Sequence, residues 1–186
     1  GEISDPVGHG TQMALIASGA VSPDGVTPAM VRESVPILVV RSFDEQGQAT
    51  NYGILRGVDY VINKGGRVVN LSWGTETESE FLRYAIGYMQ EKGLIVVAAA
   101  GNESTNRPMY PAAYRDVLAI TAQTGNGDIL GQSNHAEFIF AAALGVGSFP
   151  VGHSGPPGTS IASSFVARAL THYFLLHPDA TNEEAV

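Results

Sequence analysis

Three short segments of the sequence combine small residues with one polar side chain that can take part in catalysis. They are the histidine turn Gly8-His9-Gly10-Thr11, the asparagine turn Ala98–Asn102 and the serine turn Gly158–Ser163. Glycine and alanine let another backbone approach closely while the polar side chain projects into the gap. A serine hydroxyl attacks an amide at neutral pH only when a base takes its proton, and an imidazole is such a base. Taken alone, each segment also fits a satisfied polar group, a turn or a helix cap.

Short apolar runs predict the strands that must position these turns. The runs are largely β-branched and lack polar alternation, as expected of strands buried on both faces: Val35–Val40, Val68–Ser72, Leu94–Ala99 and Val117–Thr121. Shorter strands are expected after them, including Glu137–Ala141. Since ligands of open parallel sheets bind beyond the carboxyl ends of the strands, we expect the site after Ser72 and Ala99.

Apolar residues at helical spacing separate these runs. The spacing predicts helices over Tyr52–Asn63 and Glu78–Lys92, and a long helix from about Thr159 to Leu176. Thr181 and Glu184 form a capping-box pair that begins a further helix. Alternating strands and helices predict right-handed crossovers and an open α/β sheet that is mainly parallel.

The composition excludes several classes of function. The chain has 186 residues, which fits one domain or part of a larger one, and carries 10 Lys and Arg against 18 Asp and Glu, a formal net charge of −8. An acidic surface is unsuited to nucleic acid, because neutralising phosphates needs basic residues. With no cysteine, the chain has no disulfide, thiolate nucleophile or redox pair. No apolar run reaches the roughly 18 residues of a membrane span.

In their order and spacing, the three turns resemble those of the subtilisin-like serine proteases, the subtilases. The resemblance runs from about Gly8 to the region of Thr181, with Val69–Gly74 and Met109–Pro111 among the matching segments. It implies a three-layer α/β/α fold with a mainly parallel sheet, truncated at the N-terminus. Residues 1–186 would then form a single partial catalytic domain, with an extracellular or cell-envelope location.

The resemblance also implies a role for each polar residue. Ser160 is the nucleophile, His9 is the general base and then the general acid, and Asn102 is the side-chain donor of the oxyanion hole. The polypeptide substrate would pair with residues of two segments: Leu71, Ser72, Trp73 and Gly74 on one side, and Ala99, Ala100 and Gly101 on the other. Trp73 stands where the family more often has a smaller apolar residue, so it either shapes the pocket or packs on the surface. The bond Tyr110–Pro111 matches a cis proline of the family.

The acid of the family's triad has no counterpart in this sequence. In the family an Asp ends the first strand of the sheet, well upstream of the His, whereas this sequence starts eight residues before His9. Asp5, the only aspartate upstream, lies in a Ser-Asp-Pro turn and is expected to have a turn or cap role. We therefore expect a fragment that is nearly inactive alone, with the Asp supplied by a missing N-terminal segment of the same protein.

An alternative is a pseudoenzyme or protein-interaction domain that keeps the fold and has lost the acid. The joint presence of His9, Asn102 and Ser160 argues against it. Two other departures from the family are Ser164, where proline is common, and Arg168, where a small residue is usual. Neither is expected to touch the chemistry.

Other functions fit the sequence less well. An α/β-hydrolase needs its acid and His after the Ser, yet only His172, His177 and Asp179 follow, on or near the same helix. The string Gly145–Pro150 fails the dinucleotide-binding motif at its third glycine. The histidines show no metal-ligand spacing, so no metal or other cofactor is predicted to be required. Structural calcium at the acidic loops Asp44-Glu45 or Thr75–Glu80 is an alternative to a solvated surface there.

Overall fold

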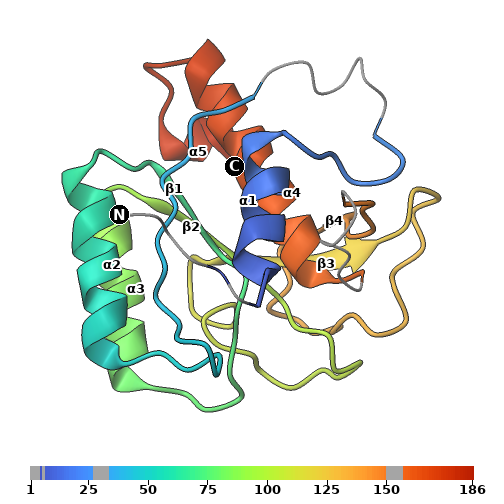
Figure 1. Ribbon diagram of the computed structural model, residues 1–186, viewed down its shortest axis with the longest axis horizontal. Helices are drawn as coiled ribbons and strands as arrows, with labels where there is room; N and C mark the ends of the chain where they lie inside the picture. Colours follow the sequence, from blue (N-terminus) through green and yellow to red (C-terminus); the bar gives the residue numbers. More distant parts are fainter. Residues whose placement is uncertain (1–4, 6, 27–33, 150–156) are drawn as a thin grey trace.

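Parallel strands form one sheet at the centre of the molecule. The computed structural model describes residues 5, 7–26, 34–149 and 157–186. Within them the sheet has the order β1-β2-β3-β4, with every pair parallel (Figure 1). The strands are β1 (Val68–Leu71), β2 (Ile95–Ala99), β3 (Leu118–Gln123) and β4 (Ala141–Leu144).

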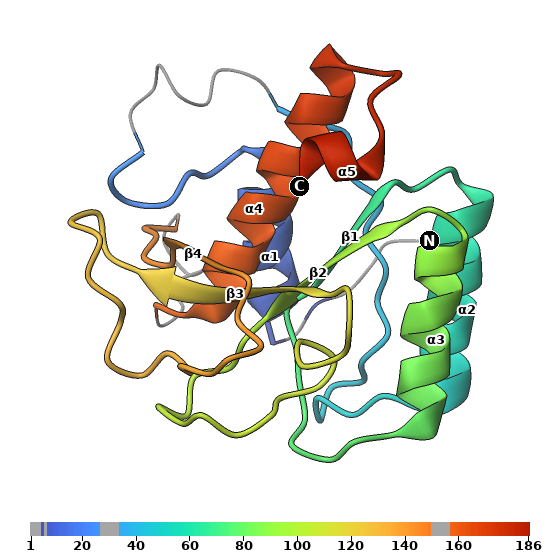
Figure 2. The same cartoon turned by 180° about the vertical axis from the view of Figure 1, so that it is seen from behind.

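Helices cover both faces of this sheet, which confirms the predicted three-layer architecture (Figures 1 and 2). The helices are α1 (His9–Ser18), α2 (Asn51–Asn63), α3 (Glu80–Glu91), α4 (Thr159–Leu176) and α5 (Asn182–Ala185). Successive residues of β2 point to opposite layers: Val96 packs with α2 and α3, and Val97 packs with α4. Because β2 is buried on both faces, its sequence is a continuous apolar run.

Local signals in the sequence fix several helix ends. The Thr50 side chain accepts a hydrogen bond from Gly53 N–H at the start of α2, and the predicted capping box of Thr181 and Glu184 begins α5. The helix predicted from Thr159 to Leu176 is confirmed at both ends. The peptide bond Tyr110–Pro111 is cis, as predicted.

Two strand predictions are wrong. Val35–Val40 has no regular secondary structure, and β4 begins at Ala141, where the predicted strand Glu137–Ala141 was expected to end. Val39 is 45% exposed, because no described strand lies beside this run. A cavity of about 1190 Å³, here called the β1 groove, instead lies between the segment 36–42 and β1. The crossover predicted to run from Val35–Val40 through α2 to β1 therefore has no strand at its start in the described residues.

None of the helices in the described ranges is both long and apolar enough to cross a membrane.

Candidate active site

The helices α1 and α4 run side by side in the same direction (Figure 1). Ile16, near the end of α1, packs in one cluster with Ile161, near the start of α4. Further along, Arg168 of α4 fills the space beside Gly19, just past the end of α1. Because the contacts advance along both helices together, the pair is parallel. The starts of both helices, which carry His9 and Ser160, therefore point toward the same end of the pair, and α1 begins before α4 along their common direction.

The asparagine turn is hydrogen-bonded directly to the serine turn. Asn102 Oδ1 accepts a hydrogen bond from Thr159 N–H at 2.9 Å, and Gly101 N–H donates to Thr159 Oγ1 at 3.1 Å. A Cβ atom on Gly158 would lie 2.8 Å from Asn102 Oδ1, so the contact needs glycine at that position. Anchoring the carboxamide oxygen leaves the Nδ2 group as the donating end of Asn102.

Ser160 lies where a helix favours negative charge. It is the second residue of α4, and the first N–H groups of a helix have no acceptors within the helix. These groups and the positive end of the helix dipole suit a developing anion. The Ser160 hydroxyl donates to the Ser72 carbonyl oxygen at 3.3 Å, so in this structure it rests on the chain that leaves β1.

The backbone carbonyl of Ser160 is held by a cluster of hydroxyl groups that we call the serine network: Ser72, Ser163 and Ser164. Their Oγ atoms donate to Ser160 O at 3.2, 3.1 and 2.8 Å respectively. Asn70 of β1 joins the network, because its Nδ2 donates to Ser72 Oγ at 2.7 Å and to Ser164 Oγ at 3.0 Å. Ser164 thus contacts the backbone of Ser160 and not its hydroxyl, and that it does not touch the chemistry stays a prediction.

Sequence reasoning also missed Asn70. The signal that could have found the network is the spacing of Ser160, Ser163 and Ser164, which places three hydroxyl residues in adjacent turns of one helix. Nothing local in the sequence pairs Asn70 with them.

Asp5 caps the helix that begins at His9. One carboxylate oxygen accepts from Gly8 N–H at 3.0 Å, and the other accepts from Thr11 N–H at 2.6 Å and Thr11 Oγ1 at 2.7 Å. Burial acts to raise the pKa of Asp5, but these hydrogen bonds and the charge of His9 outweigh it and lower the pKa. The expected turn or cap role is confirmed.

The electrostatic environment of His9 favours its neutral form. Partial burial of the imidazole lowers the pKa of His9 below its ordinary value of 6.5, although the residue as a whole is exposed. The nearby charge of Asp5 opposes this shift and is the weaker influence. At neutral pH His9 is therefore available as a base.

Replacing Asp5 should destabilise the fold without touching the serine turn. We expect Asp5→Ala to lower the free energy of unfolding at pH 7 by about 1 kcal/mol, the usual loss for a helix cap. Because folding lowers the pKa of Asp5, its contribution is present above the unfolded value and is lost as the pH falls through the folded value. Urea unfolding at pH 7 and pH 3 measures both effects. Asp59→Ala, an exposed aspartate of α2, is the matched control; equal losses in both variants would contradict the cap role.

The predicted substrate-binding segments leave the sheet side by side. Leu71 of β1 is in register with Ala98 of β2, so the residues that follow emerge at the same edge of the sheet. Ala99 and Ala100 are buried, and any contact with a substrate there would come from the backbone. Trp73 packs edge-on against Phe43 with ring centroids 5.5 Å apart, which favours the packing role over a free pocket wall.

Gly74 lies directly against the segment that contains Met109 and Tyr110. A Cβ atom on Gly74 would lie 2.8 Å from Met109 Cγ, so a larger residue would separate them. The next residue, Thr75, pairs with Tyr110 through two backbone hydrogen bonds of 2.8 Å. The segment from Leu71 to Gly74 is thus fixed at both ends.

Carboxylates of the acidic loops form hydrogen bonds and ion pairs with residues close to them in the sequence. Asp44 Oδ1 accepts hydrogen bonds from Gln46 N–H and Gln48 N–H, both at 2.9 Å. Glu78 forms an ion pair with Arg83. In the part of the chain that the structure describes, no group of three or more His, Asp or Glu side chains is placed to hold a metal ion.

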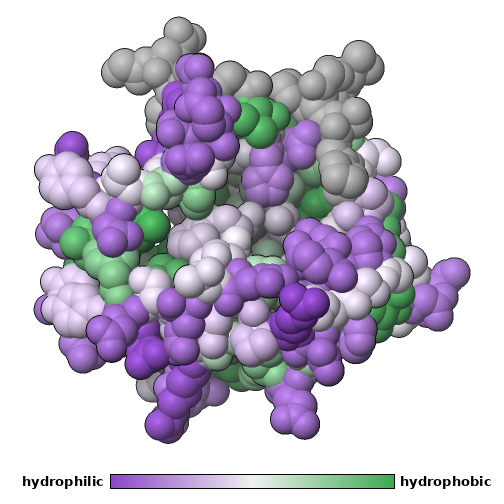
Figure 3. Space-filling view, turned by 90° about the horizontal axis from the view of Figure 1, so that it is seen from below, coloured by the Kyte–Doolittle hydropathy of each residue, from purple (hydrophilic) through white to green (hydrophobic). Residues whose placement is uncertain are grey.

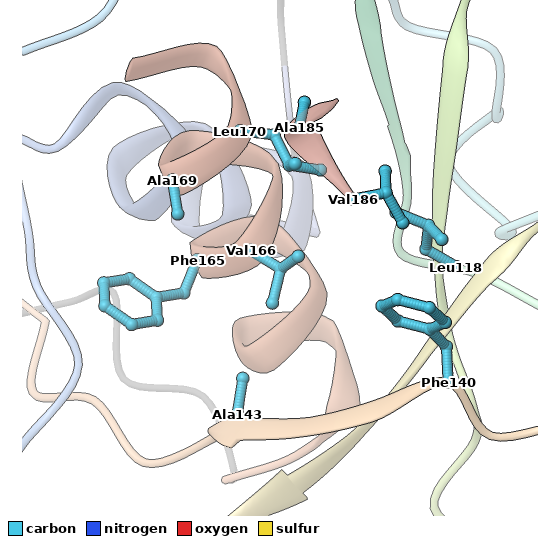
Figure 4. Close-up of a pocket in the computed structure, with 9 residues that line it drawn as sticks. All are labelled: Leu118, Phe140, Ala143, Phe165, Val166, Ala169, Leu170, Ala185 and Val186. Carbon is cyan, nitrogen blue, oxygen red and sulfur yellow. The ribbon is translucent and has the colours of Figure 1, made fainter. Parts of the chain in front are cut away.

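Of the two cavities described here, one is lined by a predicted catalytic residue and the other is not. The β1 groove includes His9 in its lining, together with Asn70 and Ser72. Figure 3 views the molecule from this side and shows a hollow that is bordered by hydrophilic residues and also by hydrophobic ones. A smaller cavity of about 320 Å³ has an apolar lining that includes Phe140, Val166 and Ala185 (Figure 4). None of the predicted catalytic residues lines this smaller cavity.

Comparison with known proteins identifies the family. Residues 2–185 match the model of the subtilase family. Thermitase of Thermoactinomyces vulgaris is 33% identical, over 86% of this chain and 58% of thermitase. The thermophilic serine proteinase of Bacillus sp. (strain AK1) is 34% identical, over 86% of this chain and 40% of that protein.

A solved structure shows the same fold. The crystal structure of a lanthipeptide protease superposes with a TM-score of 0.77 and 21% identity, covering 98% of this chain and 67% of that one. The chain spans about half the length of the curated relatives that it matches. Since the family model covers nearly all of the chain, this protein belongs to the subtilase family, the subtilisin-like serine proteases, and is a partial domain of that fold.

Proposed function

We propose that this chain carries the nucleophile and base of a serine endopeptidase whose triad acid comes from a segment outside it. Ser160 is the nucleophile, His9 the general base and acid, and Asn102 the oxyanion donor. The observation that carries the proposal is the hydrogen bond from Thr159 N–H to Asn102 Oδ1, which holds a donor beside the serine turn. The parallel packing of α1 and α4 adds the imidazole at the same end.

The proposed reaction forms and cleaves an acyl-enzyme. His9 takes the Ser160 proton while Oγ attacks the carbonyl carbon of the peptide bond. Asn102 Nδ2 and the Ser160 N–H stabilise the negative oxygen of the tetrahedral intermediate. The intermediate collapses as His9 gives its proton to the leaving amine, and a water activated by His9 then hydrolyses the acyl-enzyme.

The hydrogen bond from the Ser160 hydroxyl to the Ser72 carbonyl must break before the reaction starts. The Ser160 hydroxyl must leave the Ser72 carbonyl before it can donate to His9. The vacated carbonyl oxygen then becomes an acceptor for an N–H of the substrate backbone. Main-chain pairing along Leu71–Gly74 and Ala99–Gly101 would supply binding that does not depend on most side chains of the substrate.

The acid is the component that this chain does not supply. Both carboxylate oxygens of Asp5 are engaged in capping α1, so we assign it no role in the triad. A second carboxylate would fix the imidazole tautomer and stabilise the imidazolium. The missing N-terminal segment of the same protein is the proposed source. No metal or other cofactor is required for these steps.

The name of one relative supports a proposed location for the parent protein. Among them is a minor extracellular protease of Bacillus subtilis (strain 168), 30% identical over 87% of this chain. We place the parent protein outside the cell or in the cell envelope, with polypeptides as its substrates. Structural calcium is not assigned to the acidic loops, because Asp44 and Glu78 already have partners there.

Labelling of Ser160 by a fluorophosphonate tests the function. We expect slow labelling of the chain alone and rapid labelling when a segment that carries an Asp is joined to its N-terminus. The Ser160→Ala variant should not be labelled in either form. A pseudoenzyme would show no labelling with or without the segment, and that result would reject the proposed function.

The pH dependence of labelling should report His9. Neutral imidazole is the active form, so labelling should rise with pH through the pKa of His9, which lies below 6.5 in this chain. A second carboxylate nearby favours the imidazolium, so joining the acidic segment should move the midpoint to higher pH. Labelling rates between pH 4 and 8 and an NMR titration of His9 measure this shift. An unchanged midpoint in the joined form would contradict the contact between acid and base.

A further inference from the structure

A buried asparagine outside the predicted site contacts the asparagine turn. Asn134 lies in the segment between β3 and β4, and its exposed fraction is 0%. Asparagine is mostly found at the surface, and a carboxamide buried so completely needs hydrogen bonds for both its donor and its acceptor. The partners of Asn134 therefore indicate its role.

Both ends of the Asn134 carboxamide bind the backbone of the turn. Nδ2 donates to the Ala100 carbonyl oxygen at 2.9 Å. Oδ1 accepts from Glu103 N–H at 2.9 Å and from Thr105 N–H at 3.3 Å. These bonds hold the chain on both sides of Asn102, so one side chain fixes the turn before and after the proposed oxyanion donor.

Gly101 lets Asn134 come this close to the turn. The backbone N–H of Asn134 donates to the Gly101 carbonyl oxygen at 3.0 Å. A Cβ atom on Gly101 would overlap Asn134 Nδ2, and the φ angle of Gly101 is +105°, so both the contact and the backbone need glycine. The N–H of Gly101 donates to Thr159 Oγ1 of the serine turn. Gly101 is thus held by Asn134 at its carbonyl and by the serine turn at its N–H.

The carboxylate of Glu103 links Asn134 to the backbone of Asn102. Its Oε2 atom accepts from Asn134 Nδ2 at 3.2 Å and from Asn102 N–H at 2.8 Å. The next residue, Ser104, has a φ angle of 51°, which residues other than glycine adopt rarely. Such a conformation persists where the surroundings fix it, and Asn134 Oδ1 binds the N–H groups on either side of Ser104.

Asn134 is itself attached to the sheet. The buried Thr121 of β3 donates through Oγ1 to the Asn134 carbonyl oxygen at 2.8 Å. The strand β3 pairs with β2, and the asparagine turn follows β2. The sheet therefore holds the turn in two ways, directly through β2 and through Asn134 from β3.

We propose that Asn134 is a positioning residue of the oxyanion hole, which fixes the turn that carries Asn102. A donor stabilises the oxyanion best when it is already in place before the charge develops. The side chain of Asn134 binds the turn, so it acts on the reaction through Asn102. The effect on catalysis rests on the proposed function, in which Asn102 is the oxyanion donor, whereas the fixing of the turn does not.

A double-mutant cycle tests whether Asn134 acts through Asn102. The readout is the rate of fluorophosphonate labelling of Ser160 in the chain joined to the acidic segment, because the phosphoryl oxygen gains negative charge as Oγ attacks. Asn134→Ala should slow labelling about tenfold, less than the loss of about 10² to 10³ expected for Asn102→Ala. In the Asn102→Ala background, Asn134→Ala should cause no further loss. Losses that multiply, or no loss from Asn134→Ala, would overturn the positioning role.

Ser133→Ala is the matched control. Ser133 precedes Asn134 and is 2% exposed, but its hydroxyl donates to the Ala122 carbonyl oxygen of β3 and not to the turn. Ser133→Ala should lower the melting temperature and leave the labelling rate unchanged. A loss of labelling as large as that of Asn134→Ala would show a general effect of damage to this segment and would overturn the specific role of Asn134.

Glu103→Ala tests the same support if Asn134→Ala fails to fold. Glu103 is exposed, so its replacement leaves the core intact. The variant removes the link between Asn134 Nδ2 and Asn102 N–H. It should slow labelling about threefold, the size of one hydrogen bond, and cause no further loss in the Asn102→Ala background. An unchanged labelling rate in Glu103→Ala would overturn the positioning role.

Amide hydrogen exchange separates this inference from the proposed function. The N–H groups of Glu103 and Thr105 donate to Asn134 Oδ1, so Asn134→Ala should speed their exchange at least about tenfold. Faster exchange in a chain whose Ser160 is never labelled would support the fixing of the turn and reject the protease. Unchanged exchange, with rapid labelling of Ser160, would support the protease and overturn the role of Asn134.

Discussion

A chain joined at its N-terminus to a segment that carries the acid as Asp should hydrolyse a chromogenic peptide about 10⁴ times faster than the same chain joined to a segment with Asn at that position. Asn has the shape of Asp but lacks the charge that stabilises the imidazolium of His9. It also leaves His9 free to present the wrong nitrogen to Ser160. The loss should appear in kcat, because the acid does not touch the substrate.

Three controls define the result. The fused chain with Ser160→Ala should lose hydrolysis, which assigns the activity to Ser160. Circular dichroism and thermal unfolding should be the same for the Asp and Asn forms, which shows that both are equally folded. The chain without the segment should match the Asn form, because both lack the acid. Similar rates for the Asp and Asn forms would show that the acid comes from elsewhere and reject the proposed triad.

Much of the fold could be predicted because its signals are local. The strand β2 is apolar at every position, and a run of this kind identifies a strand buried on both faces. The helix α4 begins at a glycine turn and keeps an apolar stripe until Leu176, so both ends could be placed. The helix α5 follows from one pair of residues, Thr181 and Glu184, whose side chains satisfy backbone groups within a single turn.

The errors arise where a structure depends on a partner far away in the sequence. Val35–Val40 has the composition of a strand, but a strand needs a neighbour to pair with, and in the described part of the chain the β1 groove lies there instead. Apolar composition predicts a tendency to be buried and cannot supply the neighbour.

In the candidate site, too, residues in local motifs could be predicted from the sequence, whereas contacts between distant residues could not. His9, Asn102 and Ser160 could be found because each sits in a turn of small residues with a recognisable order. The hydrogen bond between Asn70 and Ser164 joins residues 94 positions apart, and neither has a sequence context that points to the other. Such contacts follow from the packing of β1 against α4, which only the structure gives.

Replacing Asn102 should cause the second large loss of activity. In the chain joined to the segment that carries the Asp, we expect Asn102→Ala to lower kcat by about 10² to 10³ with little change in KM, the magnitude known for the corresponding donor in subtilisin, a member of this family. The donor acts mainly on the oxyanion, which exists only after attack, so its loss falls on the transition state. Steady-state kinetics on the chromogenic peptide measure both constants.

The variant Asn102→Asp removes the Nδ2 donor but keeps an oxygen that can accept from Thr159 N–H, so it distinguishes the two functions of Asn102. An aspartate keeps an oxygen that can accept from Thr159 N–H, so the serine turn should stay in place. It replaces the Nδ2 donor with a negative oxygen, which repels the oxyanion, so kcat should fall at least as far as in Asn102→Ala. Asn126→Ala, at an exposed turn, is the control and should leave kcat unchanged. If Asn102→Asp kept the activity that Asn102→Ala lost, the residue would act by anchoring Thr159, and the oxyanion would need another donor.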